Sequence, residues 1–199
     1  MIRRSLRAIL AVGAAAALLA ACGGGTAQTA ITSSGHTPSP ASPQPTGGAP
    51  GQGWTLQTSS SAGVSIYIPP QWRSITPTNP DIAIQAVDGV SSEAGLSVNV
   101  ISKSVPGTTL ALFAQVNVAQ LKASGHVVGA ISQSNVTLPA GPAVRIQYTD
   151  NLTQGSFDLI QYLLVHGGRG IVMTFGGPTS LSGVGGTVFQ QMAESLRFL

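Results

Sequence analysis

The stretch that decides the fold lies at 157–175 and consists of FDLIQYLLV (157–165), HGGRG (166–170) and IVMTF (171–175). The first run is apolar at most positions, as expected of a central strand that is covered on both faces of a sheet. Adjacent glycines then mark a tight turn, and the second apolar run follows as the expected hairpin partner. The sequence therefore predicts an antiparallel hairpin within the core of a sheet.

Further from this hairpin, several stretches alternate apolar and polar residues. The clearest are 64–68, 96–100 and 144–149, and weaker candidates are 82–87 and 127–138. Alternation with a period of two residues is typical of a strand with one buried face. We expect all five stretches to be strands.

One helix is predicted between Thr109 and Ser124. Its apolar residues Leu110, Phe113 and Leu121 recur on one face, which is the pattern of an amphipathic helix. Gly125 follows directly, and glycine is a usual residue at the C-terminal end of a helix. Antiparallel strands combined with helices of this kind predict an α+β domain of packed layers.

A second helix is predicted at the C-terminus, where Val188, Phe189, Met192 and Leu196 share one face. Its start is predicted at Thr187, because Thr187 and Gln190 have the spacing of a capping box. The preceding glycine-rich segment, residues 183–186, is interpreted as a flexible linker or a hinge.

The N-terminus predicts export. Arginines at positions 3, 4 and 7 precede an apolar run of about 14 residues that ends at Ala21. A membrane-spanning helix needs about 20 residues, so this run is typical of a signal peptide. The segment Leu19-Ala20-Ala21-Cys22-Gly23 then resembles a bacterial lipobox. This motif implies that the Cys22 thiol receives a diacylglyceryl group and that a lipoprotein peptidase cuts before it.

The charge distribution argues against nucleic-acid binding. The chain has nine Lys and Arg residues and six Asp and Glu residues, a formal charge of +3. Three of the nine bases precede Cys22, which leaves six bases and six acids in the mature chain. Binding to phosphates requires clustered Lys and Arg on one face, and we expect no nucleic-acid partner.

Residues 22–53 are rich in Gly, Ser, Thr, Pro and Ala and carry no charge. Such a segment buries too little apolar surface to fold, so we expect a disordered tether behind the lipidated cysteine. The predicted organisation is a signal peptide at 1–21, the tether at 22–53 and a single globular domain at 54–199.

The sequence contains few residues in patterns that suggest catalysis. A Gly-x-Ser-x-Gly nucleophile elbow and a phosphate-binding loop are both missing from it. His126 and His166 are interpreted as surface or packing residues. Asp150 and Asp158 flank a predicted turn, where we expect them to be solvated rather than paired in a cleft. We therefore expect no catalytic residue, no metal site and no cofactor.

Trp72, which follows two prolines, leaves two interpretations open. It packs over the sheet as a lid on the core, or it lines a surface groove. Trp54 and Tyr67 are ambiguous in the same way.

Taken together, these motifs resemble the PsbP/Mog superfamily, and in particular mycobacterial lipoproteins of the LpqN/LpqT type. The resemblance covers residues 54–199. It rests on Gly63, Ile66, Ile68, Pro69 and Trp72, on Ala143-Val144-Arg145-Ile146, on the hairpin at 157–175, and on Phe189, Met192, Ser195, Leu196 and Phe198. It implies an α/β/α sandwich around a twisted, mainly antiparallel sheet.

Members of this superfamily are binding or adaptor proteins, so the resemblance implies a non-enzymatic adaptor in the cell envelope. Acylation of Cys22 would hold it at the outer face of the cell membrane. The expected partner is another envelope protein. An alternative hypothesis is a carrier or sensor of hydrophobic small molecules or envelope lipids. An enclosed apolar cavity would favour the carrier, and an exposed apolar patch would favour the adaptor.

Overall fold

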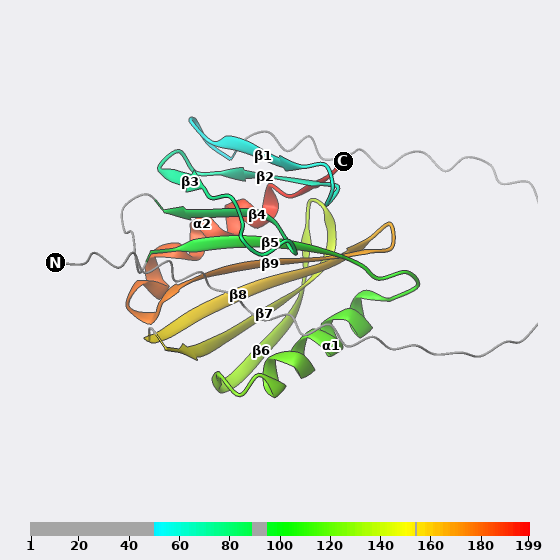
Figure 1. The fold of residues 1–199 in the computed structure, drawn as a ribbon, viewed down its shortest axis with the longest axis vertical. Coiled ribbons are helices and arrows are strands. Elements are labelled where there is room, and N and C mark those ends of the chain that lie inside the picture. The colour runs from blue at the N-terminus through cyan, green and yellow to red at the C-terminus, as the bar shows by residue number, and fades with distance from the viewer. Residues whose placement is uncertain (1–49, 89–94, 154) are drawn as a thin grey trace, which may run out of the picture.

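In the computed structural model, the chain folds into two antiparallel sheets and two helices, and the structure describes residues 50–88, 95–153 and 155–199 (Figure 1). The elements are β1 (Thr55–Ser59), β2 (Val64–Ile68), β3 (Trp72–Ser74), β4 (Ile82–Asp88), β5 (Ser97–Ser104), α1 (Leu110–Ala123), β6 (Val127–Leu138), β7 (Gly141–Leu152), β8 (Gly155–His166), β9 (Arg169–Pro178), a short 3₁₀ turn η1 (Thr179–Leu181), α2 (Ser182–Glu194) and β10 (Arg197–Phe198). The five predicted strands are confirmed as β2, β5, β7, β4 and β6.

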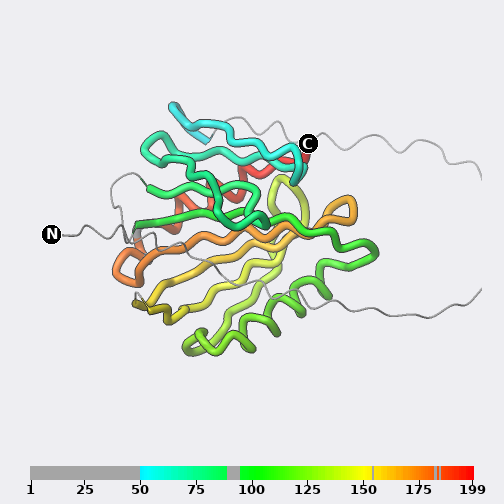
Figure 2. The backbone as a smooth tube through the Cα atoms, viewed as in Figure 1, coloured from blue at the N-terminus to red at the C-terminus, as the bar shows by residue number. Residues whose placement is uncertain are grey.

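The larger sheet has the strand order β3-β4-β5-β9-β8-β7-β6, and the smaller has the order β1-β2-β10. After β5 the chain passes through α1 to the far edge and then returns across the sheet strand by strand until β9 pairs with β5 (Figure 2). Each pairing in this sheet is antiparallel. The predicted hairpin is confirmed as β8 and β9.

The turn between β8 and β9 shows why its sequence specifies a hairpin. His166 pairs with Arg169, which leaves Gly167 and Gly168 as the two turn residues. Their φ angles are +55° and +74°. A two-residue turn with both φ angles positive matches the twist of the strands, and glycine adopts this conformation without steric cost.

The two helices pack on opposite faces of the larger sheet (Figure 1). Helix α2 contacts both β9 of the larger sheet and β2 of the smaller one, and apolar residues of both sheets join its core cluster. Helix α1 covers β6, β7 and β8 from the other side. The predicted α/β/α arrangement is thereby confirmed.

Helix α1 matches its prediction closely. The Thr109 hydroxyl accepts a hydrogen bond from the Leu112 N–H at 3.2 Å, and the helix ends at Ala123, two residues before Gly125. Phe113 lies against Gly170 of β9, where an added Cβ would come within 2.6 Å of the ring. The glycine therefore allows the helix to approach the sheet.

The predicted start of the second helix is wrong. Helix α2 begins at Ser182, so the segment 183–186 is its first part and not a linker. Glycine is a weak helix former, which is why the segment suggested a loop. Gly185 is buried, and a Cβ there would come within 2.7 Å of the Phe189 ring. Close packing of this ring is therefore one reason for a small residue inside the helix.

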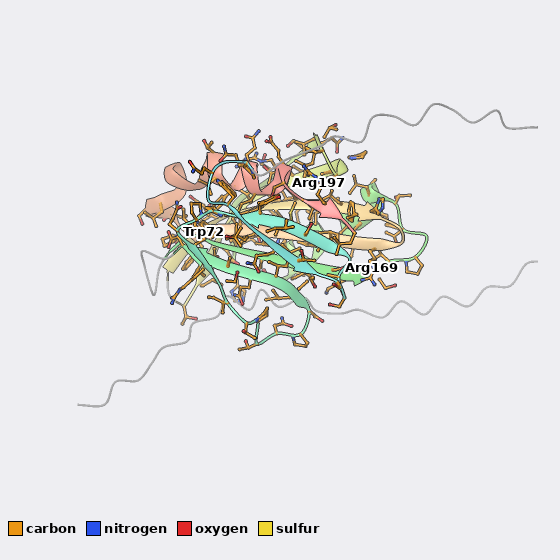
Figure 3. The ribbon with its side chains drawn as sticks, turned by 90° about the horizontal axis from the view of Figure 1, so that it is seen from above. Trp72, Arg169 and Arg197 are labelled. Carbon is orange, nitrogen blue, oxygen red and sulfur yellow. The ribbon has the colours of Figure 1, made fainter. Side chains whose placement is uncertain are left out.

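The two interpretations of Trp72 are decided in favour of the core. Trp72 is buried, and its ring meets the Phe189 ring edge to face at a centroid distance of 6.3 Å. Figure 3 shows it at the end of the molecule opposite Arg169. Trp54 is partly buried against the same cluster. The contact between Trp72 and Phe189 therefore packs β3, an edge strand of the larger sheet, against α2.

In the described part of the chain, none of the helices is both long and apolar enough to cross a membrane. The predicted signal peptide, Cys22 and nearly all of the tether lie outside the described residues. The predicted boundaries at 21/22 and 53/54 therefore stay predictions.

Candidate binding groove beside helix α2

On the face of the sheet that α2 packs against, the side chains of β7 and β8 change from apolar to mainly polar where α2 no longer covers them. On the α2 face, β7 carries Arg145, Gln147 and Thr149 at alternate positions, and β8 carries Asp158 and Ile160. Thr149 lies opposite Asp158, and Gln147 lies opposite Ile160. This part of the sheet therefore presents a mainly polar surface next to the apolar core.

An open groove of about 320 Å³ follows this polar surface. Phe189 of α2 and Leu96 contribute apolar wall, as do Pro178 and Ile160, while Ser132 of β6 contributes a hydroxyl. The complete lining consists of Leu96, Ala130, Ser132, Gln147, Tyr148, Thr149, Asp158, Leu159, Ile160, Gly177, Pro178 and Phe189. Both polar and apolar groups are available to an occupant.

A bulge in β6 shapes the side of the groove. The pairing with β7 shifts between Val128 and Ser132, so the three residues between them oppose Tyr148 alone. Gly129 has a φ angle of +75°, a conformation that favours glycine. Bulges bend and twist a strand, and here the bulge brings Ala130 and Ser132 into the lining.

Hydrogen bonds hold the polar side chains of this surface. The Thr149 hydroxyl donates to Asp158 Oδ1 at 2.8 Å, and Arg145 Nη1 donates to Gln147 Oε1 at 2.6 Å. The surface thus offers one carboxylate and one guanidinium together with neutral donors and acceptors. Such a set can hydrogen-bond an uncharged polar segment, while the partly exposed Ile160 and Pro178 offer apolar surface.

A second hollow of about 300 Å³ lies between the β1–β2 turn, the β3–β4 loop and β5. Arg169, labelled in Figure 3, lies beside it and donates to the Ser61 carbonyl at 3.1 Å and to Ser102 Oγ at 3.4 Å. Its lining consists of Ser59, Ser61, Ala62, Pro80, Asp81, Ile82, Ala83 and Ser102. Because Arg169 is already engaged by these groups, we favour the groove beside α2.

The two acids considered from sequence do not face one cleft. Asp158 lines the groove on the α2 face. Asp150 lies opposite Phe157 in the β7–β8 ladder, and it belongs to the alternating set of β7 that points to the α1 face. It is only 7% exposed, so the prediction that it is solvated is wrong. The strand continues to Leu152, which places Asp150 inside the ladder and not in the turn.

Burial determines the electrostatics around Asp150. Desolvation raises the pKa of its carboxyl group, and the nearby His126 partly lowers it again. Its Oδ1 has no hydrogen-bond partner among the described residues. Burial also raises the pKa of the neighbouring Tyr148, and the negative charge of Asp150 adds to this effect.

We expect Asp150→Asn to stabilise the folded protein increasingly as the pH rises. A carboxyl group whose pKa is raised by folding contributes stability below its unfolded-state pKa and loses it as the pH passes the folded-state pKa. Asparagine keeps the shape without the charge. Urea unfolding from pH 3 to 8 measures the difference in the free energy of unfolding between the variant and the native protein. This difference should grow as the pH rises above 3.8, the ordinary pKa of an aspartate. A difference that stays constant with pH would contradict this expectation.

The structure places the histidines apart from the groove lining. His166 is exposed and stacks on Phe198, with centroids 4.1 Å apart. His126 is also exposed, and it lies close enough to Asp150 to lower the pKa of the Asp150 carboxyl group. Within residues 50–88, 95–153 and 155–199, no three His, Cys, Asp or Glu residues form a group suited to a metal ion.

Sequence reasoning did not identify Ser132, Gln147 or Thr149 as candidate site residues. The alternation that predicted β7 also marks its polar face, which is ordinarily the solvent face of a strand. The signal is therefore present in the sequence, but it does not distinguish open solvent from a groove bordered by a distant helix.

Comparisons with known proteins concern the fold. No protein-family model and no curated protein matches the chain. Solved structures similar to it include those of three different proteins. PsbP of the cyanobacterium Synechocystis has a TM-score of 0.57 at 12% identity, covering 80% of this chain and 99% of its own. LpqN of Mycobacterium tuberculosis, described as involved in cell envelope biogenesis, has a TM-score of 0.54 at 12% identity, with coverages of 72% and 89%.

The third is the Ran-binding protein Mog1p of Saccharomyces cerevisiae, with a TM-score of 0.52 at 11% identity, covering 73% of this chain and 95% of its own. At these identities the likeness extends to the fold and not to a shared site. It agrees with the resemblance that the sequence motifs indicate. The chain therefore has the fold of the PsbP/Mog1-like proteins.

Proposed function

We propose that this protein is a non-enzymatic binding or adaptor lipoprotein, held at the outer face of the cell membrane by an acylated Cys22. In this proposal the groove beside α2 is the surface that receives the partner. The observation that carries it is the open, mixed lining of the groove, with Asp158, Gln147 and Thr149 on its floor and Phe189 in its wall.

The chemistry of the groove favours an adaptor over a carrier of hydrophobic molecules. An acyl chain in this groove would cover the Asp158 carboxylate, and an ion removed from water without a compensating charge is strongly destabilised. A peptide segment, by contrast, can hydrogen-bond to this floor. Helix α1 also exposes Leu112 and Val116, one turn apart, to 51% and 44%. Exposed apolar side chains of this kind support contact with a protein.

The proposed location in the cell rests on the lipobox at Cys22 and on the uncharged, Gly-, Ser-, Thr- and Pro-rich composition of the segment that follows it. The likeness to LpqN is compatible with a place in the envelope, because that protein is described as involved in cell envelope biogenesis. Anchoring by two or three acyl chains would be stable, whereas a single chain gives only marginal binding. The tether at 22–53 would then separate the domain from the membrane surface.

Affinity capture from envelope extracts tests the groove. We expect Ser132→Trp, which places a large ring in the groove, to reduce capture of the partner several-fold. The neighbouring Gln133→Trp is the matched control, because successive side chains of a strand point to opposite faces. Both positions are exposed, so both variants should fold. The captured material is analysed for proteins and for lipids.

Equal capture by the two variants would contradict the groove as the binding surface, and capture of lipids alone would favour the carrier. The proposal also excludes catalysis. Turnover of an ester, peptide or glycan by the purified protein, lost in His126→Ala or His166→Ala, would contradict it.

A further inference from the structure

The outer edge of β6 pairs with no other described strand. β6 is the last strand of the larger sheet, and its twelve residues contain no charged residue and no proline. The four residues from Ser132 to Asn135 are all exposed, and their side chains alternate between the two faces of the sheet. Thr137 is also exposed. Natural proteins usually protect such an edge with charges, prolines, bulges or short strands, because its free backbone groups can pair with another strand.

The other edge strands in the described part of the chain are shorter, and β10 has only two residues. β3, at the opposite edge of the larger sheet, has only three residues, includes Arg73 and follows two prolines. β1, at an edge of the smaller sheet, has five residues. In β6 the bulge interrupts the ladder between Val128 and Ser132. Among the described strands, the regular segment Ser132–Leu138 is therefore the longest edge without a partner strand.

Pro142 shows which backbone groups of β6 point outward. Pro142 lies opposite Thr137, and proline has no N–H to donate, so this pair is not one that exchanges hydrogen bonds. Hydrogen-bonded and non-hydrogen-bonded pairs alternate along an antiparallel ladder. Gln133, Asn135 and Thr137 therefore direct their backbone N–H and C=O groups away from β7.

We propose that this edge pairs with the same edge of a second copy of the chain, antiparallel and centred on Asn135. Only this register uses all three outward-facing residues: Asn135 opposes Asn135 of the second copy, and Gln133 opposes Thr137. The segment is uncharged, so self-pairing brings no like charges together. Opposed Gln and Thr side chains can hydrogen-bond across the junction. The two larger sheets become one continuous sheet.

A junction of two such short segments is smaller than a standard stable interface. The pairing is therefore concentration-dependent, and a covalent trap is a better measure of it than size in dilute solution. It does not depend on the groove or on acylation of Cys22.

Disulfide trapping of the full chain in membranes of the expressing cells tests the register. Hydrogen-bonded partners in an antiparallel pair have Cα atoms about 5.5 Å apart, within the range that a disulfide spans. Asn135→Cys should therefore form a covalent dimer on mild oxidation. Gln133→Cys is the matched control, because its two copies would lie about 14 Å apart along the strands. Its yield should be lower by about an order of magnitude.

The double variant Gln133→Cys with Thr137→Cys should restore the dimer. Equal yields from Asn135→Cys and Gln133→Cys would overturn the proposed register, and so would trapping of a different protein by Asn135→Cys. The unsubstituted chain, with Cys22 as its one cysteine, separates the two proposals. A dimer formed through Cys22 would show a free thiol and count against acylation, whereas the contrast between positions 135 and 133 tests the strand pairing.

Discussion

Replacing Phe189 with alanine is expected to lower the free energy of unfolding by about 3–5 kcal/mol. The side chain is only 5% exposed. The centroid of its ring lies 5.1 Å from the ring centroid of Phe175, and the ring meets that of Trp72 edge to face. Removing it leaves a cavity that the surrounding rings can fill only in part, because they are held by separate strands. For a domain of this size, the loss is a large share of the total stability.

Chemical denaturation measured by fluorescence is a suitable assay, because Trp72 contacts the altered site. Gln190→Ala is the matched control on the same helix. Gln190 is exposed and donates to the Glu194 carboxylate at 2.8 Å, and exposed substitutions usually change stability by less than about 0.5 kcal/mol. Equal effects of the two substitutions would place α2 outside the cooperative core.

The largest effect on location is expected from Cys22→Ala. The thiol is the group that the lipobox motif implies is acylated, so alanine should abolish fatty-acid labelling and leave the precursor uncut by the lipoprotein peptidase. Metabolic labelling and detergent phase partitioning measure both results. The native mature form should enter the detergent phase through its acyl chains.

Gly23→Ser is the matched control for the anchor, because it alters the adjacent residue, keeps the thiol and retains a residue type found at that lipobox position. Labelling should persist in this variant. A native protein that takes up no fatty acid would contradict the proposed anchor, and the fold described above would be unaffected.

The order of strands in the sheet shows how far local patterns reach. Alternation predicted β7, and the glycine pair predicted the β8–β9 hairpin, since both signals act between neighbouring residues. Neither signal predicts that β9 lies between β8 and β5. That pairing joins segments separated by a helix and three strands, and it depends on the burial of the whole sheet.

The start of α2 and the state of Asp150 were mispredicted for a related reason. Local propensity disfavours helix at Gly185, but the helix packs Phe189 against Trp72 and Phe175 of distant strands, and this burial outweighs the cost. Polar residues near a turn are ordinarily solvated, but β7 continues to Leu152, so Asp150 lies buried within the ladder of neighbouring strands. In both cases a contact from a distant segment outweighed the local preference.

The sequence by itself determined strands β2 and β4 to β9, the helix α1, the α+β class and the expectation of an exported chain, because periodicity, turn residues and the lipobox are local properties. Tertiary structure decided which polar face of the sheet became a groove and which strand edge stayed open. The groove exists because α2 covers only part of one face, and the edge of β6 is available because no other described strand pairs with it. Both features depend on where distant elements end, which no local pattern records.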